Sequence, residues 1–461
     1  MFHKRTASAS SYESILRPNI SDQLITMLTA LPISEDKYHC ATSVTQRETE
    51  DAIKNIYMSI LESIKLSDQV LAKLDLKVSQ LLDDIESEEG SKPDDDRKCE
   101  PMDAELNVDL HLRYIEHFLG NPLPAGFSAL DCNHGWMLYW LLNSHSLLQD
   151  GTVPENLRAP VSAKIEQIVI DGGHGGIAGG PHGQIGHAAS TYASVLTLVL
   201  MEDFELLEKI KPSLYQWFVS LKKEDGSYAM HHNGESDVRS TYCVLSVAAL
   251  LNILTDELLE GTVEFLLSCQ TFEGGFAGTP YTEAHGGYTF CALAALYVTP
   301  QKFKNVDMSS LLRWLGARQL HVEGGFSGRS NKLVDGCYSF WIGASFALVE
   351  AFEEAQSFFN RTALKTYILN CCQDKKFGGL RDKPGKNPDF YHTNYTLSGL
   401  SIAEHTYEPS GPYNFKTREI LEGATNTVDI NPAFGLPIDL VRKCHNYFYS
   451  QDSSAAKSDN K

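Results

Sequence analysis

Two stretches of the chain contain residue types that can bind a metal ion. The stretch GRSNKLVDGCYSFW (328–341) contains Asp335 and Cys337, and the stretch DKPGKNPDFYHTNY (382–395) contains His392. Carboxylate, thiolate and imidazole groups together suit zinc, and three protein ligands leave one coordination position open, as in catalytic sites. An Asp-x-Cys pair with a distant histidine is also common by chance, so a buried cysteine and a helix-capping aspartate are the alternative interpretation.

Hydrogen-bond donors surround these candidate ligands. Four side chains of this kind are His285, Arg329, Lys332 and Tyr338. Flexible or forked donors suit the oxygens of a diphosphate group. Asp382, beside Lys383 and Lys386, adds a carboxylate suited to holding Mg²⁺ next to the phosphates.

A glycine turn followed by an apolar segment recurs five times, and this repeat must position the candidate residues. With Gly176, Gly226, Gly275, Gly325 and Gly379 as markers, the steps are 50, 49, 50 and 54 residues. A period of this size indicates a supersecondary unit that buries its apolar face by stacking on its neighbours.

Each repeat pairs an amphipathic segment before the glycines with a segment after them that is apolar nearly all round, such as STYCVLSVAALLNIL from Ser240. A helix that is apolar on every side is buried on every side, whereas one with a polar face borders water. No sustained alternation indicates strands. The pattern predicts an all-α protein, an α/α toroid in which helical hairpins close a barrel of about six inner and six outer helices.

The toroid is expected to bring the candidate residues to one end. Corresponding starts of adjacent inner helices lie side by side in a toroid, so Asp335, Cys337 and His392 should converge there with the basic side chains around them. Further residues of the inner helices lie below this rim: Trp136, Tyr242, Tyr288, Cys291, Trp341 and Tyr395. Such side chains usually fill a core, but several of them under a cationic rim favour a deep apolar pocket for an isoprenoid diphosphate.

Charge and cysteine content restrict the partners and the compartment. The chain has 39 basic and 59 acidic residues, a net charge of −20, which is unfavourable for general binding to nucleic acid or to an anionic membrane surface. We find no apolar run of the ~20 residues that a bilayer crossing needs. The cysteines are scattered apart from Cys371 and Cys372, and we identify no signal peptide, so a reduced, cytoplasmic protein is expected.

The flanks differ from the repeat region. The expected units are an N-terminal extension (1–103), a toroid domain (104–450) and a disordered tail (451–461). Within the extension, a helix is predicted at Gln46–Ile64, starting from a Thr45 cap, and the acidic segment 83–99 is expected to be a disordered linker.

Three long motifs resemble the β subunits of protein farnesyltransferases, members of the protein prenyltransferase family. They read EAHGGYTFCALAAL, NKLVDGCYSFWIG and DKPGKNPDFYHTNYTLSGLSIAEH, and the resemblance extends from about Leu130 to His405. It implies an α/α barrel that forms a heterodimer with a separate helical α subunit. It also implies transfer of farnesyl from farnesyl diphosphate to the cysteine of proteins that end in a CaaX sequence.

The resemblance further implies roles for the residues that match these motifs. One zinc ion per subunit would be bound by Asp335, Cys337 and His392. The diphosphate would be held by His285, Arg329, Lys332 and Tyr338. Asp382 would bind Mg²⁺ for turnover, Arg239 would border the isoprenoid and peptide sites, and Tyr391 would contact the peptide.

Three alternatives are open at this point. The β subunit of geranylgeranyltransferase type I shares the zinc and diphosphate residues but has smaller residues at the pocket floor, where bulky Trp136 and Tyr395 favour the shorter chain here. Terpene cyclases of the squalene type share the toroid but need an acidic DxDD motif, which we do not find; the aspartates at 94–96 lie in the predicted linker. A non-catalytic helical scaffold would have no use for the complete set of ligands and basic residues.

Overall fold

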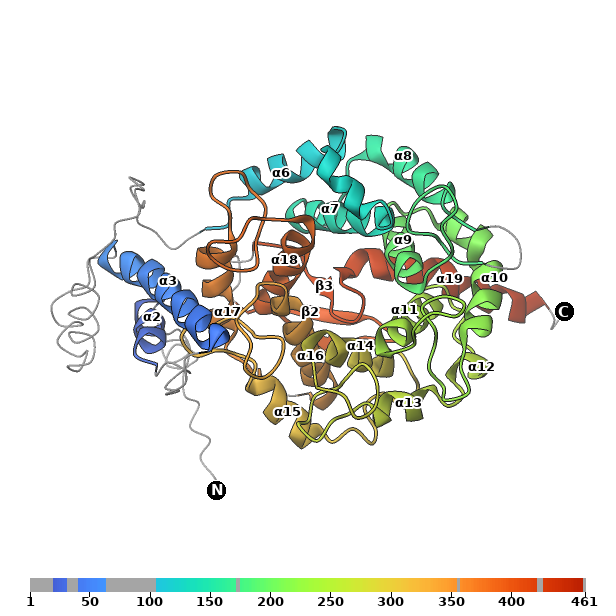
Figure 1. Ribbon diagram of the computed structural model, residues 1–461. Coiled ribbons are helices and arrows are strands. Elements are labelled where there is room, and N and C mark those ends of the chain that lie inside the picture. Colours follow the sequence, from blue (N-terminus) through green and yellow to red (C-terminus); the bar gives the residue numbers. More distant parts are fainter. Residues whose placement is uncertain are drawn as a thin grey trace, which may run out of the picture.

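A closed inner ring of helices forms the centre of the structure (Figure 1). The computed structural model describes residues 20–30, 40–63, 105–170, 175–354, 357–420 and 426–458. The ring consists of α7 (His134–Leu148), α9 (Ala188–Leu200), α11 (Val238–Leu250), α14 (Gly286–Tyr297), α16 (Tyr338–Glu353) and α18 (Phe390–Glu404). Each helix contacts the next one, and α18 also contacts α7, so the ring is closed.

A second set of helices covers the outside of the ring. Its members are α6 (Val108–Gly120), α8 (Glu155–Glu166), α10 (Phe204–Leu221), α12 (Asp256–Leu259), α13 (Thr262–Ser268), α15 (Met308–Gly316) and α17 (Arg361–Tyr367). The helix α17 continues directly into a π-helix, η2 (Ile368–Cys372), and a 3-10 helix, η1 (Ala125–Leu130), connects α6 to α7.

The side-chain pattern explains why the helices divide into two rings. The inner helix α9 is buried along almost its whole length. The outer helix α10 buries Leu207, Leu214 and Phe218 on one face and exposes Glu205 and Lys209. None of the described helices is both long and apolar enough to cross a membrane. The predicted α/α toroid with its two rings of helices is confirmed.

The repeated glycines are required where one repeat touches the backbone of the next. Gly226 has a φ of +86°, and a Cβ there would lie 2.1 Å from the carbonyl oxygen of Gly261. Gly274 has a φ of +110°, and its Cβ would lie 2.0 Å from the carbonyl oxygen of Ser310. A side chain at either position would be strained and would separate neighbouring repeats. The regular spacing of glycines in the sequence is therefore explained by these close approaches between neighbouring repeats.

Short strands follow α18, which the sequence did not predict. They are β1 (His405–Pro409), β2 (Phe415–Glu419), β3 (Ile430–Asn431) and β4 (Leu436–Pro437), paired β1 with β2 and β3 with β4, both antiparallel. Strands of two to five residues are too short to produce a sustained alternation of apolar and polar side chains. These short strands are an addition to a protein that is otherwise helical, as predicted.

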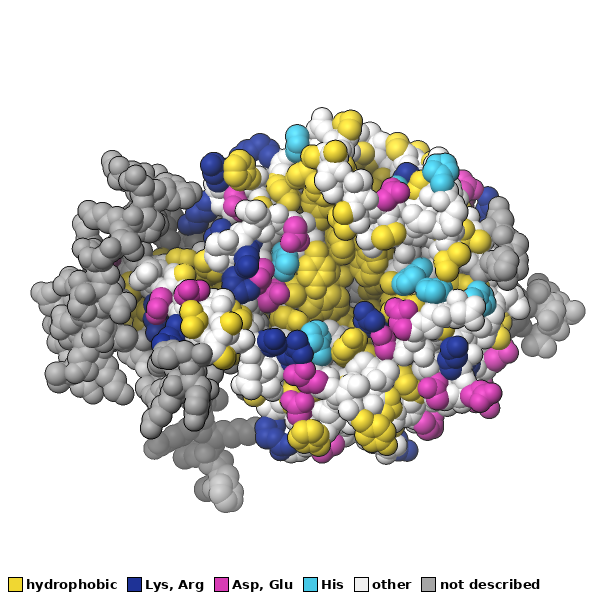
Figure 2. All heavy atoms as spheres, in the orientation of Figure 1, with side chains coloured by type: hydrophobic (Ala, Val, Ile, Leu, Met, Phe, Trp, Pro, Cys, Tyr) yellow, Lys and Arg dark blue, Asp and Glu magenta, His cyan; other side chains and the backbone are white. Residues whose placement is uncertain are grey.

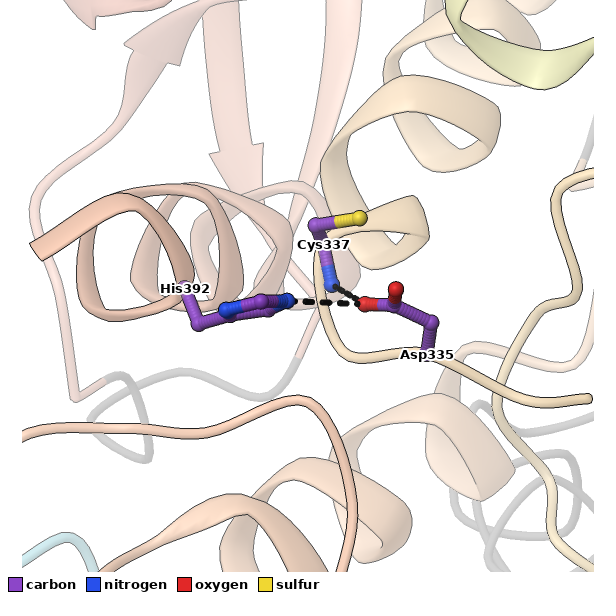
Figure 3. Close-up of side chains that lie close together, drawn as sticks. All are labelled: Asp335, Cys337 and His392. Atoms are coloured by element: carbon purple, nitrogen blue, oxygen red, sulfur yellow. Dashed lines mark hydrogen bonds and ion pairs between the residues drawn. The ribbon is translucent and has the colours of Figure 1, made fainter. Parts of the chain in front are cut away.

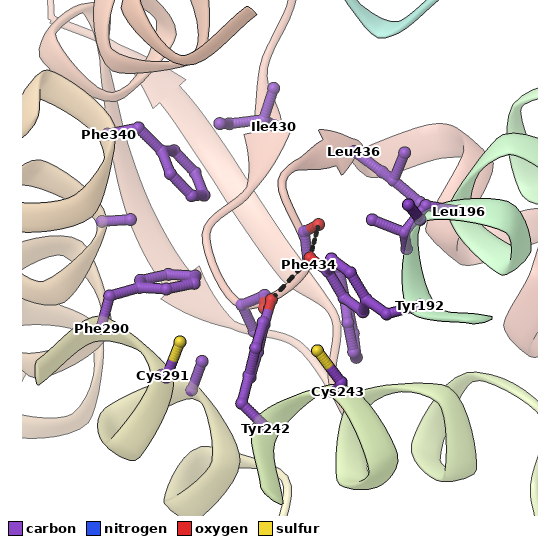
Figure 4. Close-up of a cluster of buried hydrophobic side chains, with 14 of the residues drawn as sticks. Tyr192, Leu196, Tyr242, Cys243, Phe290, Cys291, Phe340, Ile430, Phe434 and Leu436 are labelled. Carbon is purple, nitrogen blue, oxygen red and sulfur yellow. Dashed lines mark hydrogen bonds between the residues drawn. The ribbon is translucent and has the colours of Figure 1, made fainter. Parts of the chain in front are cut away.

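The segment 430–437, which we call the plug, lies inside the inner ring (Figures 1 and 4). The carbonyl oxygen of Gly435 accepts hydrogen bonds from Tyr139 Oη (3.0 Å) and Asn143 Nδ2 (2.9 Å). The carbonyl oxygen of Ala433 accepts one from Tyr242 Oη (2.9 Å). Because inner-ring side chains on α7 and α11 satisfy its buried backbone groups, the plug is fixed in place and fills the centre of the ring.

The last helix, α19 (Ile438–Ser458), leaves the plug and contacts α9 and α11. The predicted boundary between the toroid domain and the tail, at residue 450, falls within this helix. Residues 459–461 and the predicted linker at 83–99 lie outside the described residues.

Two helices precede the toroid and lie against α17 on its outer side (Figure 1): α2 (Ile20–Leu28) and α3 (Ala41–Ser63). We call them the N-terminal arm. The predicted helix at Gln46–Ile64 corresponds to α3, but it begins five residues earlier, and Thr45 is an internal residue whose hydroxyl donates to the carbonyl oxygen of Ala41 (3.0 Å). Hydrogen bonds between Cys40 and Ser43 hold the helix start instead.

A buried carboxyl group lies beneath the arm. The side chain of Glu323 is 0% exposed, and its Oε1 accepts a hydrogen bond from Gln46 Nε2 (2.8 Å), which also donates to Glu50 Oε1 (2.8 Å). Burial raises the pKa of Glu323 to about 7; the charge of Glu50 adds to this effect, while the hydrogen bond from Gln46 and the charge of Lys54 oppose it. Glu323 therefore changes its charge near neutral pH.

Docking of the arm is expected to weaken as the pH rises from 5 to 8. The folded chain binds the Glu323 proton more tightly than the unfolded chain, so the stabilisation is complete below about pH 4.5 and is lost as the pH rises through about 7, by up to about 3 kcal/mol. Hydrogen exchange of the α3 amides, corrected for the intrinsic effect of pH, measures this change. Glu323→Gln should remove the dependence, whereas Glu48→Gln on the exposed face should keep it. Equal pH profiles for wild type and Glu323→Gln would contradict this prediction.

Candidate active site

Asp335, Cys337 and His392 lie together at one end of the inner ring (Figure 3). Asp335 and Cys337 directly precede α16, and His392 is in the first turn of the adjacent helix α18. The distance from His392 Nε2 to Asp335 Oδ1 is 3.3 Å, and one ligand atom from each of the three residues lies within 4.8 Å of the others. The structure therefore brings together the three side chains that the repeat predicted to converge.

Asp389 fixes the orientation of the His392 ring, and sequence reasoning missed it. As the N-cap of α18, Asp389 accepts a hydrogen bond from the backbone N–H of His392 (2.7 Å), and its other oxygen lies 2.7 Å from Nδ1 of the ring. Because Nδ1 is engaged by this carboxylate, Nε2 is directed toward Asp335 and Cys337. The spacing Asp-x-x-His at the start of an apolar helix is the signal that would have identified this residue.

The protonation states of His392 and Cys337 show which protons a bound metal ion would replace. Burial alone would lower the pKa of His392, but its hydrogen bonds with Asp335 and Asp389 outweigh this effect and raise that pKa to about 10. Burial and the charge of Asp335 raise the pKa of the Cys337 thiol. The imidazole is therefore protonated and the thiol neutral at neutral pH, so a bound metal ion would take the place of these protons. One sulfur, one nitrogen and one carboxylate donor fit zinc.

His285 and Tyr338 form a hydrogen-bonded pair beside the cluster. His285 is the N-cap of α14: its Nδ1 accepts from the backbone N–H of Gly287 (3.0 Å), and its Nε2 lies 3.1 Å from Tyr338 Oη. Burial and the nearby charge of Arg329 lower the pKa of His285, which favours the neutral ring. With Nδ1 accepting, the proton is assigned to Nε2, which donates to the Tyr338 oxygen and leaves the Tyr338 O–H free to donate outward.

The cationic side chains of the rim differ in how they are paired. Arg329 Nη1 lies 2.6 Å from Glu283 Oε2, and both side chains are partly exposed. Arg239 forms a bidentate ion pair with Asp237, the N-cap of α11. Lys332 is exposed and forms no ion pair with any of the described residues. Lys332 is thus available to bind an anion at the rim.

Asp382 lies next to the turn that carries Asp335. Its backbone oxygen accepts a hydrogen bond from Gly336 N–H (2.7 Å), and its carboxylate forms an ion pair with Lys383. Burial and the negative charge of Asp335 raise the pKa of Asp382, which the charge of Lys383 opposes. Asp382 and Lys383 therefore add one carboxylate and one buried ammonium group beside the three candidate ligands.

The rim surrounds a hollow with an apolar interior (Figure 2). Trp341 and Tyr395 pack with ring centroids 4.2 Å apart, and Trp341 Nε1 donates to Tyr391 Oη (2.9 Å). The guanidinium of Arg239 lies 5.5 Å from the centre of the Tyr288 ring. The aromatic residues predicted to line a pocket are thus on the inner ring, and Tyr391 lies next to the candidate ligand His392, with ring centroids 5.1 Å apart.

Among the predicted pocket residues, Tyr242 contacts the plug (Figure 4). Tyr242 hydrogen-bonds both to the plug and to Tyr192 Oη (2.8 Å), and the buried Cys291 follows the adjacent Phe290 on α14. The Trp136 ring packs against Tyr192 at 5.8 Å between centroids. Sequence reasoning missed Tyr192, although it occupies the same place in an STY motif as Tyr242, one repeat earlier.

Comparison with known proteins identifies the family whose sequences match this chain. Residues 106–436 match the family model described as "Prenyltransferase alpha-alpha toroid domain". The protein farnesyltransferase subunit beta of Schizosaccharomyces pombe is 42% identical over 362 residues, 76% of this chain and 92% of the relative. The protein of the same name from Saccharomyces cerevisiae is 45% identical over 368 residues, 78% of this chain and 84% of the relative.

A solved structure shares the fold at low sequence identity. It is described as Candida albicans protein geranylgeranyltransferase-I complexed with GGPP, and it matches with a TM-score of 0.61 and 21% identity over 75% of this chain and 99% of that chain. At this identity the likeness supports the toroid architecture alone.

Proposed function

The chain belongs to the prenyltransferase α/α-toroid family and, within it, to the protein farnesyltransferase β subunits, and from this premise we propose that it is the catalytic β subunit of a zinc-dependent protein farnesyltransferase. The reaction would transfer farnesyl from farnesyl diphosphate to the cysteine of a protein with a C-terminal CaaX sequence. The observation that carries the proposal is the convergence of Asp335, Cys337 and His392 beside a cationic rim and above an apolar hollow.

The metal part of the site would act on the nucleophile. Asp335, Cys337 and His392 would hold one zinc ion, which when bound would supply the positive charge that lowers the pKa of the substrate thiol from its usual value of about 8.5. The chain's own contribution is orientation. Asp389 holds the His392 ring through Nδ1, and Asp335 is fixed by the hydrogen bond that it accepts from the backbone N–H of Cys337 (2.9 Å).

The rim would act on the leaving group. A bond forms between the cysteine sulfur and C1 of the prenyl chain, and the bond from C1 to the diphosphate oxygen breaks, so its electron pair leaves with pyrophosphate. The outward O–H of Tyr338 and the free ammonium of Lys332 would donate to the growing negative charge, and such donors are each worth about 2.7–4 kcal/mol in comparable sites. Arg329 would join them by exchanging Glu283 for a phosphate oxygen.

The remaining predicted residues would bind the substrates and the second cation. Asp382 would hold Mg²⁺ beside the diphosphate. The prenyl chain would occupy the apolar hollow along Trp136, Tyr242, Cys291, Trp341 and Tyr395, and the peptide would lie near Arg239, Tyr288 and Tyr391. The relatives favour a farnesyltransferase subunit over a terpene cyclase or a non-catalytic scaffold. Both are named protein farnesyltransferase subunit beta, and this chain matches each of them over most of its length.

Co-purification with a prenyltransferase α subunit tests the proposal. A β subunit of this family implies a partner subunit, and we expect the heterodimer to transfer farnesyl to a peptide ending in CaaX and not to the same peptide with serine in place of the cysteine. The chain expressed alone should be inactive or aggregate, since obligate partners bury large apolar interfaces. A heterodimer that transfers no prenyl group, or a lone chain with full activity, would contradict the proposal.

A further inference from the structure

The N-terminal arm packs on the outside of the toroid directly behind the candidate metal site. Its apolar side chains form a cluster with the toroid that is separate from the main core. The arm contributes Leu24, Met27, Leu28, Ile53, Tyr57 and Leu61, and the toroid contributes Leu320, Val334, Ala363, Tyr367, Cys371 and Cys372. All of these residues are at least nine-tenths buried, and Val334 immediately precedes Asp335 in the sequence.

The arm contacts the turn that leads to the candidate ligands. Tyr57 Oη donates to the carbonyl oxygen of Glu323 (2.7 Å), and Gln46 Nε2 donates to the side chain of the same residue (2.8 Å). At the next residue, Gly324, an added Cβ would lie 2.6 Å from Cε of Met27, so the arm packs directly on the turn. This turn is hydrogen-bonded to the ligand segment, because Asp335 N–H donates to the carbonyl oxygen of Phe326 (3.1 Å).

A second connection runs through η2 and Asp382. Cys371 Sγ lies 4.0 Å from Tyr57 Oη, and both belong to the buried cluster. Tyr367, also in the cluster, donates from Oη to the carbonyl oxygen of Asp382 (2.9 Å), which also accepts from Gly336 N–H (2.7 Å). Gly336 lies between the two candidate ligands of this segment. The arm therefore supports the ligand segment both through the turn and through Asp382.

We propose that the N-terminal arm is a positioning element for the metal and diphosphate site, with Tyr57 as its central positioning residue. Asp335 and Cys337 lie in the turn between the bridge at Val334 and the start of α16. Contacts from behind add to the hydrogen bonds of this turn and help to hold the two side chains within the tolerance of about 0.5 Å that a functional site needs. Residues that orient metal ligands typically change metal affinity by about 10–100-fold when they are removed. The metal part of this inference rests on the proposed function.

Three variants of the full chain, purified with its partner subunit, test the inference. Tyr57→Ala removes the hydroxyl and the packing, Tyr57→Phe removes the hydroxyl alone, and Asn55→Ala changes an exposed residue of the same helix. We expect Tyr57→Ala to speed hydrogen exchange in peptides that cover 333–340 and to speed zinc release to a chelator by about 10-fold. Tyr57→Phe should have a smaller effect and Asn55→Ala none.

Loss of general stability must be separated from loss of positioning. Leu440→Ala, on the buried face of α19, should lower the unfolding temperature without changing zinc release or exchange at 333–340. In turnover, Tyr57→Ala should lower kcat and leave the KM for the peptide unchanged.

The inference is overturned if exchange at 333–340 is the same in Tyr57→Ala and wild type, or if Leu440→Ala changes it equally. Amide exchange requires neither metal nor turnover, so this outcome can be told apart from failure of the proposed function.

Discussion

Replacement of Cys337 by alanine is expected to remove zinc from the purified heterodimer and to lower turnover at pH 7 by at least about 30-fold. Cys337 supplies the sulfur of a three-ligand set, and two remaining ligands leave the ion poorly held. Without the metal, a substrate thiol with a pKa of about 8.5 is only about 3% ionised at pH 7, which sets the lower limit of the loss. Metal analysis and a farnesyl-transfer assay on the same preparation measure both effects.

Two neighbouring variants sharpen this test. His392→Ala should lose zinc as Cys337→Ala does, whereas Asp389→Asn should weaken zinc binding by about 10–100-fold because it disturbs only the orientation of the ring. Asp382→Ala serves as the matched control: it should keep the full zinc content and instead raise the Mg²⁺ concentration needed for turnover. Zinc retained in both Cys337→Ala and His392→Ala would remove the metal assignment.

The convergence of the candidate ligands could be predicted because the repeat supplied it. Neither the pair Asp335 and Cys337 nor the distant His392 indicates a site on its spacing alone. The 50-residue period places the starts of α16 and α18 side by side, and this adjacency turns residues 55 apart into neighbours. The burial of the inner helices was equally predictable, since a helix without a polar face has no side to present to water.

The parts that could not be predicted lack such a period. The plug at 430–437 is an irregular segment whose position depends on tyrosine hydroxyls from helices that lie far away in the sequence. The arm buries Ile53, Tyr57 and Leu61 on one face of α3, a helical spacing that indicates an amphipathic helix but not the surface that receives it. Contacts between segments about 300 residues apart leave no local signal in either of them.

The plug bears on which prenyl group the enzyme accepts. A farnesyl chain has fifteen carbons and a geranylgeranyl chain twenty, so the hollow must be one isoprene unit deeper for the longer donor. The plug cannot retreat to provide this depth, because Tyr139, Asn143 and Tyr242 hold its carbonyl groups by buried hydrogen bonds. Additional depth must therefore come from side chains, and the family resemblance points to bulky Trp136 and Tyr395 as those that limit it.

Trp136→Thr, alone or with Tyr395→Phe, is expected to shift donor preference toward geranylgeranyl diphosphate by at least about 10-fold. A pocket distinguishes even a single methylene by about 10–200-fold, and a close-packed interior does not yield to an inserted group, so removal of most of an indole should admit the extra unit. The measurement is the ratio of kcat/KM for the two donors on one CaaX peptide. Trp136→Phe keeps much of the bulk and should shift the ratio less, and Tyr297→Phe, at the far end of α14, should leave it unchanged.

A wild type that already prefers the longer donor would favour a type I geranylgeranyltransferase subunit. A ratio that stays constant in Trp136→Thr would mean that this aromatic ring does not limit the length of the prenyl chain.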